Sequence, residues 1–106
     1  MGFRDAQQAV DRWVGQFEEG YFTPLVNVAR LAEEVGELAR EVNDHFGPKA
    51  KKPDEEPGSI PMELADILFV VICIANSQRI DLDDAFAQMM AKVTSRDAGR
   101  WTRKAR

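Results

Sequence analysis

The amino-acid sequence predicts an all-α fold, a four-helix bundle that completes its core by oligomerisation. Apolar residues recur at helical spacing in four segments, and no segment alternates between apolar and polar residues as a half-buried strand does. Proline, glycine and capping residues separate the four segments. A chain of 106 residues has room for little more than one hydrophobic core, so we expect a single domain over residues 1–106.

The first two helices are predicted on either side of a break at residues 18–23. Residues 2–17 carry an apolar stripe made of Ala6, Val10, Trp13, Val14 and Phe17. Thr23 is a suitable N-cap for the second helix, and Pro24 suits its first position. This helix should end near residue 43, before Gly47 and Pro48, and its apolar stripe consists of Leu31, Val35, Leu38 and Val42.

A polar stretch with three prolines follows at residues 48–59, and its composition is typical of a mobile loop. Its lysines are candidates for a lid over a functional site, although a solvated loop is the more ordinary interpretation. These lysines are Lys49, Lys51 and Lys52.

The third helix is predicted from the N-cap Ser59, with Pro61 in its first turn, to about residue 79. Between positions 64 and 75 only Asp66 is polar, which predicts a helix buried on nearly every side. A domain this small can hardly surround one helix, so we expect part of its surface to face another subunit. The longest apolar run, residues 67–75, is too short to span a bilayer, and no membrane partner is expected.

The fourth helix is predicted to start after the N-cap Asp81. Its apolar side consists of Leu82, Ala85, Phe86, Met89, Met90 and Val93. The second and third helices are therefore expected to form the centre of the bundle.

Charge and cysteine content exclude several classes of function. The net charge of −4 argues against general nucleic-acid binding, yet residues 92–106 alone carry +5. A basic tail on an acidic body suits a small anion that arrives with a divalent metal, and a solvated tail fits the charge equally well. A single cysteine and a single histidine exclude zinc sites made of several such ligands. We expect a reducing, cytoplasmic location because no signal pattern is visible and Cys73 has no partner in the chain.

Two acidic clusters on the central helices are the most informative feature of the sequence. Glu34 and Glu37 are three residues apart beside the apolar stripe of the second helix, so both can reach one point at the edge of the core. Glu33 points further outward, and a solvated face explains it equally well. Glu63 and Asp66 repeat the three-residue spacing on the most apolar helix of the chain.

These carboxylates indicate a metal site. Burying Asp66 without a partner would be costly, and four carboxylates close together would repel one another without a cation. Two carboxylate pairs on adjacent helices offer the oxygen ligands that Mg²⁺ and Mn²⁺ prefer. A di-iron carboxylate bundle is excluded because its Glu-x-x-His pattern is missing, and a Nudix box is rejected because Glu37 stands at an apolar position of that motif.

The sequence resembles the MazG-like, all-α nucleoside triphosphate pyrophosphohydrolases, and most closely their small YpjD-type branch. The pattern Glu33-Glu34-x-x-Glu37, 25 further residues and then Glu63-x-x-Asp66 matches the signature of that family. The likeness covers nearly the whole chain and is carried also by residues 16–17, 20–25, 38–43, 68–77, 96–97 and 100–104.

The resemblance implies a Mg²⁺-dependent enzyme, with Mn²⁺ as a substitute, that converts a nucleoside triphosphate to the monophosphate and pyrophosphate. It implies that Glu34, Glu37, Glu63 and Asp66 coordinate metal. Glu33 is then the catalytic candidate that holds or deprotonates the attacking water, or it serves a second metal. It also implies a homodimer or homotetramer with the site near subunit contacts. Ala65, where glycine is common, and the missing asparagine within residues 92–96 depart from the pattern.

Further residues are candidates for binding the substrate. Lys92, Arg96 and Arg100 share a face if the tail is helical, although Gly99 can break that helix, and the first two are favoured as phosphate ligands. Asn76 suits a hydrogen bond to sugar or base, with helix capping as an equal alternative. Aromatic candidates for stacking on a base are Trp101, Tyr21, Phe22, Trp13 and Phe17, of which the last two more often belong to a core.

Two other functions remain open on sequence alone. One is an oligomeric, non-enzymatic α-helical interaction module whose acids are surface residues. The other is a phosphohydrolase of a different diphosphate-containing metabolite. The sequence does not determine the preferred base or sugar, or the number of metal ions.

Overall fold

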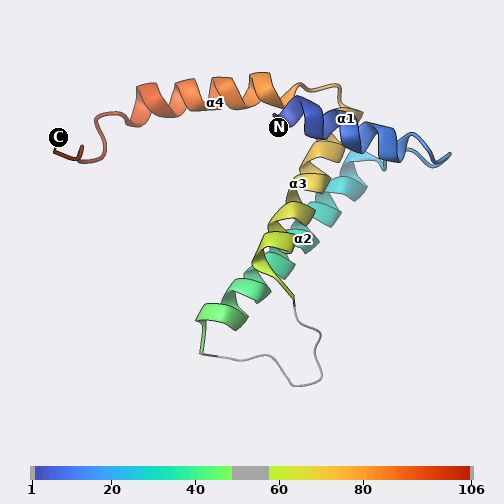
Figure 1. Ribbon diagram of the computed structural model, residues 1–106, viewed down its shortest axis with the longest axis horizontal. Coiled ribbons are helices and arrows are strands. Elements are labelled where there is room, and N and C mark those ends of the chain that lie inside the picture. The colour runs from blue at the N-terminus through green and yellow to red at the C-terminus, as the bar shows by residue number, and fades with distance from the viewer. Residues whose placement is uncertain (1, 49–57, 106) are drawn as a thin grey trace.

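The computed structural model describes residues 2–48 and 58–105, and all regular structure within them is helical. The helices are α1 (Phe3–Val14), α2 (Pro24–Phe46), α3 (Ile60–Ser77) and α4 (Leu82–Asp97), as Figure 1 shows. The prediction of an all-α fold with four helices is confirmed. The lysines considered for a lid, Lys49, Lys51 and Lys52, lie outside the described residues.

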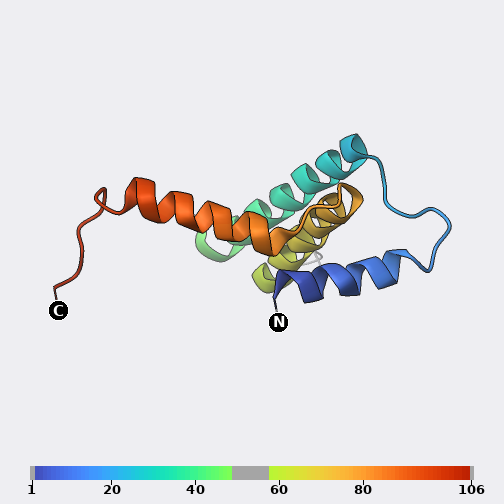
Figure 2. The same cartoon turned by 90° about the horizontal axis from the view of Figure 1, so that it is seen from above.

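The four helices of the single chain do not close into a compact bundle. Helices α2 and α3 lie side by side as a hairpin, and α1 crosses the C-terminal end of α3 (Figures 1 and 2). Helix α4 packs mainly against α1 and then runs away from the hairpin. The prediction that the second and third helices form the centre agrees with this arrangement.

The helix starts follow local capping chemistry. The Thr23 hydroxyl accepts a hydrogen bond from the backbone N–H of Val26 at 3.4 Å, and the Ser59 hydroxyl accepts one from Met62 at 3.0 Å. The Asp81 carboxylate accepts from the backbone of α4 in the same way. All three residues were expected as N-caps, and all three are confirmed.

The helix ends differ by a few residues from the prediction. Helix α1 stops at Val14 because Gly15 begins a turn. Helix α2 continues to Phe46, where the N–H of Gly47 bonds to the carbonyl of Asn43. Helix α3 stops at Ser77, and Arg79 adopts the left-handed conformation that usually belongs to glycine at a helix end.

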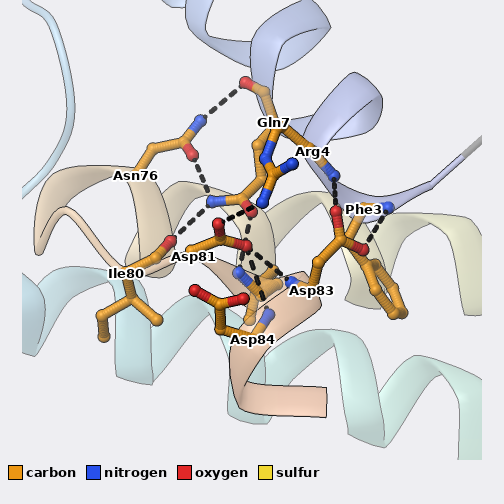
Figure 3. Close-up of polar contacts among 9 residues, drawn as sticks. Phe3, Arg4, Gln7, Asn76, Ile80, Asp81, Asp83 and Asp84 are labelled. Carbon is orange, nitrogen blue, oxygen red and sulfur yellow. Dashed lines mark hydrogen bonds and ion pairs between the residues drawn. The ribbon is translucent and has the colours of Figure 1, made fainter. Parts of the chain in front are cut away.

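A polar junction joins α1 to the loop before α4 (Figure 3). The Asp83 carboxylate accepts hydrogen bonds from the backbone N–H groups of Phe3 and Arg4, and the Gln7 side chain accepts one from Leu82. The Arg4 guanidinium also bonds to Asp81 at 2.6 Å, and this contact lowers the pKa of the Asp81 carboxyl. The direction of α4 is therefore set by its contacts with α1.

Large apolar side chains remain exposed on all four helices, most notably on α3 and α4. Leu64 and Leu68 of α3 are 47% and 49% exposed, so within one chain this helix is not buried on nearly every side as predicted. Only its second half supplies the buried core, which consists of Val70, Ile72, Cys73 and Ala75. On α4, Phe86, Met89 and Met90 are also exposed.

By length and composition, α3 is the helix of the described residues that could span a membrane, with a mean hydropathy of 1.8. Its early turns carry Glu63 and Asp66, and the helix packs along α2. These features are typical of the central helix of a helical domain.

Candidate metal centre

Three of the predicted metal ligands meet between α2 and α3. Glu34 of α2 and Glu63 and Asp66 of α3 each offer one carboxylate oxygen, and these oxygens lie within 4.8 Å of one another. All three residues are half-buried. The spacing of Glu63 and Asp66 puts both on the α3 face toward α2, where they meet Glu34.

The electrostatics of this acidic cluster favour a bound cation. Partial burial raises the pKa of the Glu63 carboxyl, and the negative charges of Asp66 and Glu34 raise it further. Glu37 and Glu41 act in the same direction from one and two turns further along α2. A divalent cation would reverse this repulsion, and an all-oxygen donor set suits Mg²⁺ or Mn²⁺.

The other two acids of the first motif are more exposed than the three that meet. Glu37 is exposed. Its negative charge contributes to the raised pKa of Glu63, but its carboxylate is not among the three that lie within 4.8 Å of one another. Glu33 is also exposed, as its outward position on the helix predicts. Both carboxylates are therefore accessible to solvent.

An aromatic pocket of about 330 Å³ adjoins the cluster. Arg30 and Phe69 line it; Arg30 precedes Glu34 by one turn on α2, and Phe69 follows Asp66 by three residues on α3. The Arg30 guanidinium lies 4.9 Å from the centre of the Phe22 ring. The other lining residues include Trp13, Phe17, Tyr21, Asn27 and Cys73.

Two side chains shape the polar part of this pocket. Asn27 is fully buried and donates a hydrogen bond to the carbonyl of Phe22, while its own oxygen accepts from Arg30 at 3.4 Å. Burial raises the pKa of Tyr21 to about 12, and its hydroxyl donates to Asp11 at 2.6 Å. The pocket thus combines aromatic faces with one cationic side chain.

Asn76 is held by hydrogen bonds within the chain. Its amide donates to the backbone carbonyl of Gln7 at 3.0 Å and to the Tyr21 hydroxyl at 2.9 Å, and its oxygen accepts from the Gln7 side chain. These contacts join α1 to α3 and favour the structural role of Asn76 over a contact with sugar or base.

The basic residues of α4 are not beside the cluster of their own chain. Helix α4 leads away from the α2–α3 hairpin (Figure 1), and Lys92 and Arg96 belong to its second half. Arg96 and Arg100 pair with Asp97 at 3.0 and 3.8 Å. Trp101 is 72% exposed, with the Arg100 guanidinium 5.4 Å from its ring centre.

Comparison with known proteins decides the family. Residues 22–101 match the MazG nucleotide pyrophosphohydrolase domain. The chain belongs to the MazG family. The match contains α2, α3 and α4 and every residue of the acidic cluster, whereas α1 lies outside it. MazG proteins are generally metal-dependent, in agreement with the carboxylates that meet here.

Relatives with known sequences or structures support this assignment. The chain is 54% identical to YpjD of Bacillus subtilis strain 168, an uncharacterized protein, over 95% of this chain and 91% of that protein. It superposes on the crystal structure of YpjD with a TM-score of 0.78 and 51% identity, covering 87% of this chain and 94% of the other. A Bacillus-conserved MazG protein described as a nucleotide pyrophosphohydrolase gives a TM-score of 0.75 at 51% identity, covering 87% and 88%.

Sequence reasoning did not single out three residues that the structure places near the cluster or in the pocket wall. Glu41 is only 6% exposed, and its position four residues after Glu37 continues the acidic face of α2. Asn27 and Arg30 precede Glu34 by seven and four residues, so they lie on the same face in the other direction. That line of polar residues along one face of α2 was the available signal.

Proposed function

We propose that this MazG-family protein hydrolyses nucleoside triphosphates to nucleoside monophosphates and pyrophosphate in the presence of Mg²⁺, with Mn²⁺ as a substitute. The observation that carries the proposal is the approach of Glu34, Glu63 and Asp66 to within 4.8 Å. Family membership supplies the reaction class, because the matched domain is that of nucleotide pyrophosphohydrolases.

In this proposal, some of the acidic residues bind the metal and another activates the attacking water. Glu34, Glu63 and Asp66 hold the cation, and Glu37 completes the set from the adjacent turn of α2. A divalent cation held there would supply neutralisation of phosphate charge and a lowered pKa for a water bound to it. Glu33, the exposed neighbour of Glu34, holds or deprotonates the water that attacks the α-phosphorus.

In this proposal, the nucleoside binds in the aromatic pocket next to the cluster. Its aromatic residues offer faces for stacking on a base, and the Arg30 guanidinium, held by the buried Asn27, offers hydrogen-bond donors at its polar side. Because Arg30 and Phe69 of the pocket lie about one turn from Glu34 and Asp66 on the same two helices, a nucleotide with its base in the pocket could extend its phosphates to the carboxylates.

A second copy of the chain completes the site in this proposal. Lys92, Arg96, Arg100 and Trp101 are candidates for binding phosphate or base, but α4 carries them away from the cluster of their own chain. A homodimer or homotetramer would cover the exposed Leu64, Leu68 and Phe86 and could bring a partner's α4 to the carboxylates. Cytoplasmic location and independence from nucleic acid and membrane stay predictions.

A substrate panel with separate detection of pyrophosphate and orthophosphate tests the proposal. The panel contains ribo- and deoxyribonucleoside triphosphates, together with other diphosphate-containing metabolites, each with and without Mg²⁺. We expect pyrophosphate from at least one nucleoside triphosphate. Turnover confined to another diphosphate compound would assign a different substrate class. Absence of any turnover, with no thermal stabilisation by Mg²⁺ or Mn²⁺, would favour the interaction-module hypothesis.

A further inference from the structure

A buried carboxylate lies beyond the metal cluster on α2. Glu41 is 6% exposed, which makes it the most buried charged residue of the described part of the chain. It follows Glu34 by seven residues and Glu37 by four, so all three share one face of the helix. Burial of a carboxylate is costly, so its retention here requires compensating contacts.

The Glu41 carboxylate lies against the start of α3. A methyl group added at Gly58 would overlap with this carboxylate, so the carboxylate occupies its present position only because residue 58 has no side chain. On the α2 side, the His45 ring nitrogen Nε2 lies 4.0 Å from a carboxylate oxygen of Glu41. A negative charge at a helix N-terminus is also favoured by the helix dipole.

This contact is linked to the metal cluster through the first turn of α3. Gly58 precedes the N-cap Ser59, whose carbonyl accepts a hydrogen bond from the N–H of Glu63 at 3.0 Å. A shift of Gly58 relative to Glu41 would therefore displace Glu63, and with it Asp66, relative to Glu34 on α2. The charge of Glu41 also reaches the cluster, since it contributes to raising the pKa of Glu63.

We propose that Glu41 is a positioning residue that fixes the start of α3 against α2 and thereby holds Glu63 and Asp66 at metal-binding distance from Glu34. This inference rests on the proposed metal-dependent function. Residues that support metal ligands from outside typically change metal affinity by about 10- to 100-fold when they are replaced. Glu41 is expected to act in this way without contacting substrate.

The test measures the Mg²⁺ concentration for half-maximal activity and kcat at saturating Mg²⁺ in the full-length protein. Glu41→Gln should raise that concentration about tenfold or more, while kcat at saturation stays within about threefold of the parent. Glu18→Gln, the same change at an exposed residue, is the matched control and should leave both values unchanged. A merely structural role would lower the melting temperature without moving the half-activating concentration.

Gly58→Ala tests the contact between residue 58 and Glu41 without removing the Glu41 carboxylate. The added methyl should displace Glu41 and raise the half-activating Mg²⁺ concentration by a similar factor. Gly36→Ala adds a methyl where nothing lies within 4 Å, and serves as its control. Combining Gly58→Ala with Glu41→Asp, whose shorter side chain makes room for the methyl, should lower the Mg²⁺ requirement below that of Gly58→Ala alone.

The outcomes separate this inference from the proposed function. If the parent needs Mg²⁺ but neither Glu41→Gln nor Gly58→Ala changes the concentration required, the positioning role is wrong and the metal site stands. If the parent shows neither Mg²⁺-dependent turnover nor stabilisation by Mg²⁺, the proposed function fails, and the inference fails with it. Should Glu41→Gln not fold, Gly58→Ala and the double variant still decide the question.

Discussion

Gln7 and Asp83 each accept hydrogen bonds from backbone N–H groups at the start of the other's helix. Gln7 of α1 accepts a hydrogen bond from the backbone N–H of Leu82 at the start of α4, at 2.9 Å. Asp83 of α4 accepts hydrogen bonds from Phe3 and Arg4 at the start of α1, at 3.1 and 3.0 Å. Because each helix supplies hydrogen-bond acceptors to the start of the other, the arm that carries Lys92 and Arg96 is oriented by α1, which lies outside the matched family domain.

Replacement of Asp83 by alanine should therefore weaken the junction. We expect the free energy of unfolding to fall by about 1 kcal/mol, the usual loss when a helix cap is removed. Urea denaturation measures this value. Asp84→Ala is the matched control, because Asp84 is the adjacent first-turn acid and is exposed. An equal decrease in the free energy of unfolding in the two variants would show that Asp83 stabilises the protein through its charge alone, and not through its hydrogen bonds.

Asp66→Asn should abolish turnover while the protein remains folded. Asparagine keeps the shape of the side chain and removes one of the charges that repel in the metal-free cluster. Without metal, the melting temperature should equal or exceed that of the parent, and the increase caused by Mg²⁺ should be smaller. Full activity, or the same stabilisation by Mg²⁺ as in the parent, would remove Asp66 from the site.

Glu33→Gln should separate water activation from metal binding. Activity should fall strongly because the carboxylate that holds or deprotonates the water is lost, whereas stabilisation by Mg²⁺ should largely remain. Thermal melts with and without Mg²⁺, together with one activity assay, measure both effects. Loss of the Mg²⁺-induced stabilisation in this variant would instead place Glu33 among the metal ligands.

The raised pKa of Glu63 has a defined consequence for stability without metal. A carboxyl whose pKa is higher in the folded than in the unfolded protein favours folding at low pH, and this contribution is lost as pH rises through the folded value. Glu63→Gln should therefore raise the free energy of unfolding of the metal-free protein at neutral pH. The increase should be smaller below about pH 4.5, the ordinary pKa of a glutamate carboxyl. Denaturation at several pH values in EDTA, without Mg²⁺, tests this. A destabilised variant at neutral pH would contradict the repulsion assigned to the cluster.

The exposed apolar side of α4 should be buried between subunits. We expect light scattering at micromolar concentration to give at least a dimer for the parent. Met89→Glu should shift the oligomeric state toward smaller species, because a charge would be placed at the subunit interface near Phe86 and Met90. Gln88→Glu, on the neighbouring exposed position, should leave the mass unchanged. A monodisperse parent monomer would refute subunit assembly.

Much of this fold could be predicted because its determinants are local. Thr23, Ser59 and Asp81 mark helix starts through side chains that bond to the next turn, and each is visible in the sequence. Likewise, Glu63 and Asp66 had to share one face of their helix. Their meeting with Glu34 required only that α2 and α3 pack side by side.

The remainder depends on tertiary contacts that helical periodicity does not encode. The direction of α4 follows from the Gln7 and Asp83 contacts, which join residues more than 70 positions apart in the sequence. The role proposed for Glu41 depends on the approach of Gly58 to its carboxylate across the hairpin. Neither relationship has a signal in the spacing of apolar residues along one helix.

The most direct test of the central claim is the identity of the phosphorus product released from a nucleoside triphosphate in the presence of Mg²⁺. The proposed cleavage between the α- and β-phosphates predicts one pyrophosphate and one nucleoside monophosphate per turnover, with no turnover by Asp66→Asn. Orthophosphate and a nucleoside diphosphate as the primary products across all nucleoside triphosphates would contradict it.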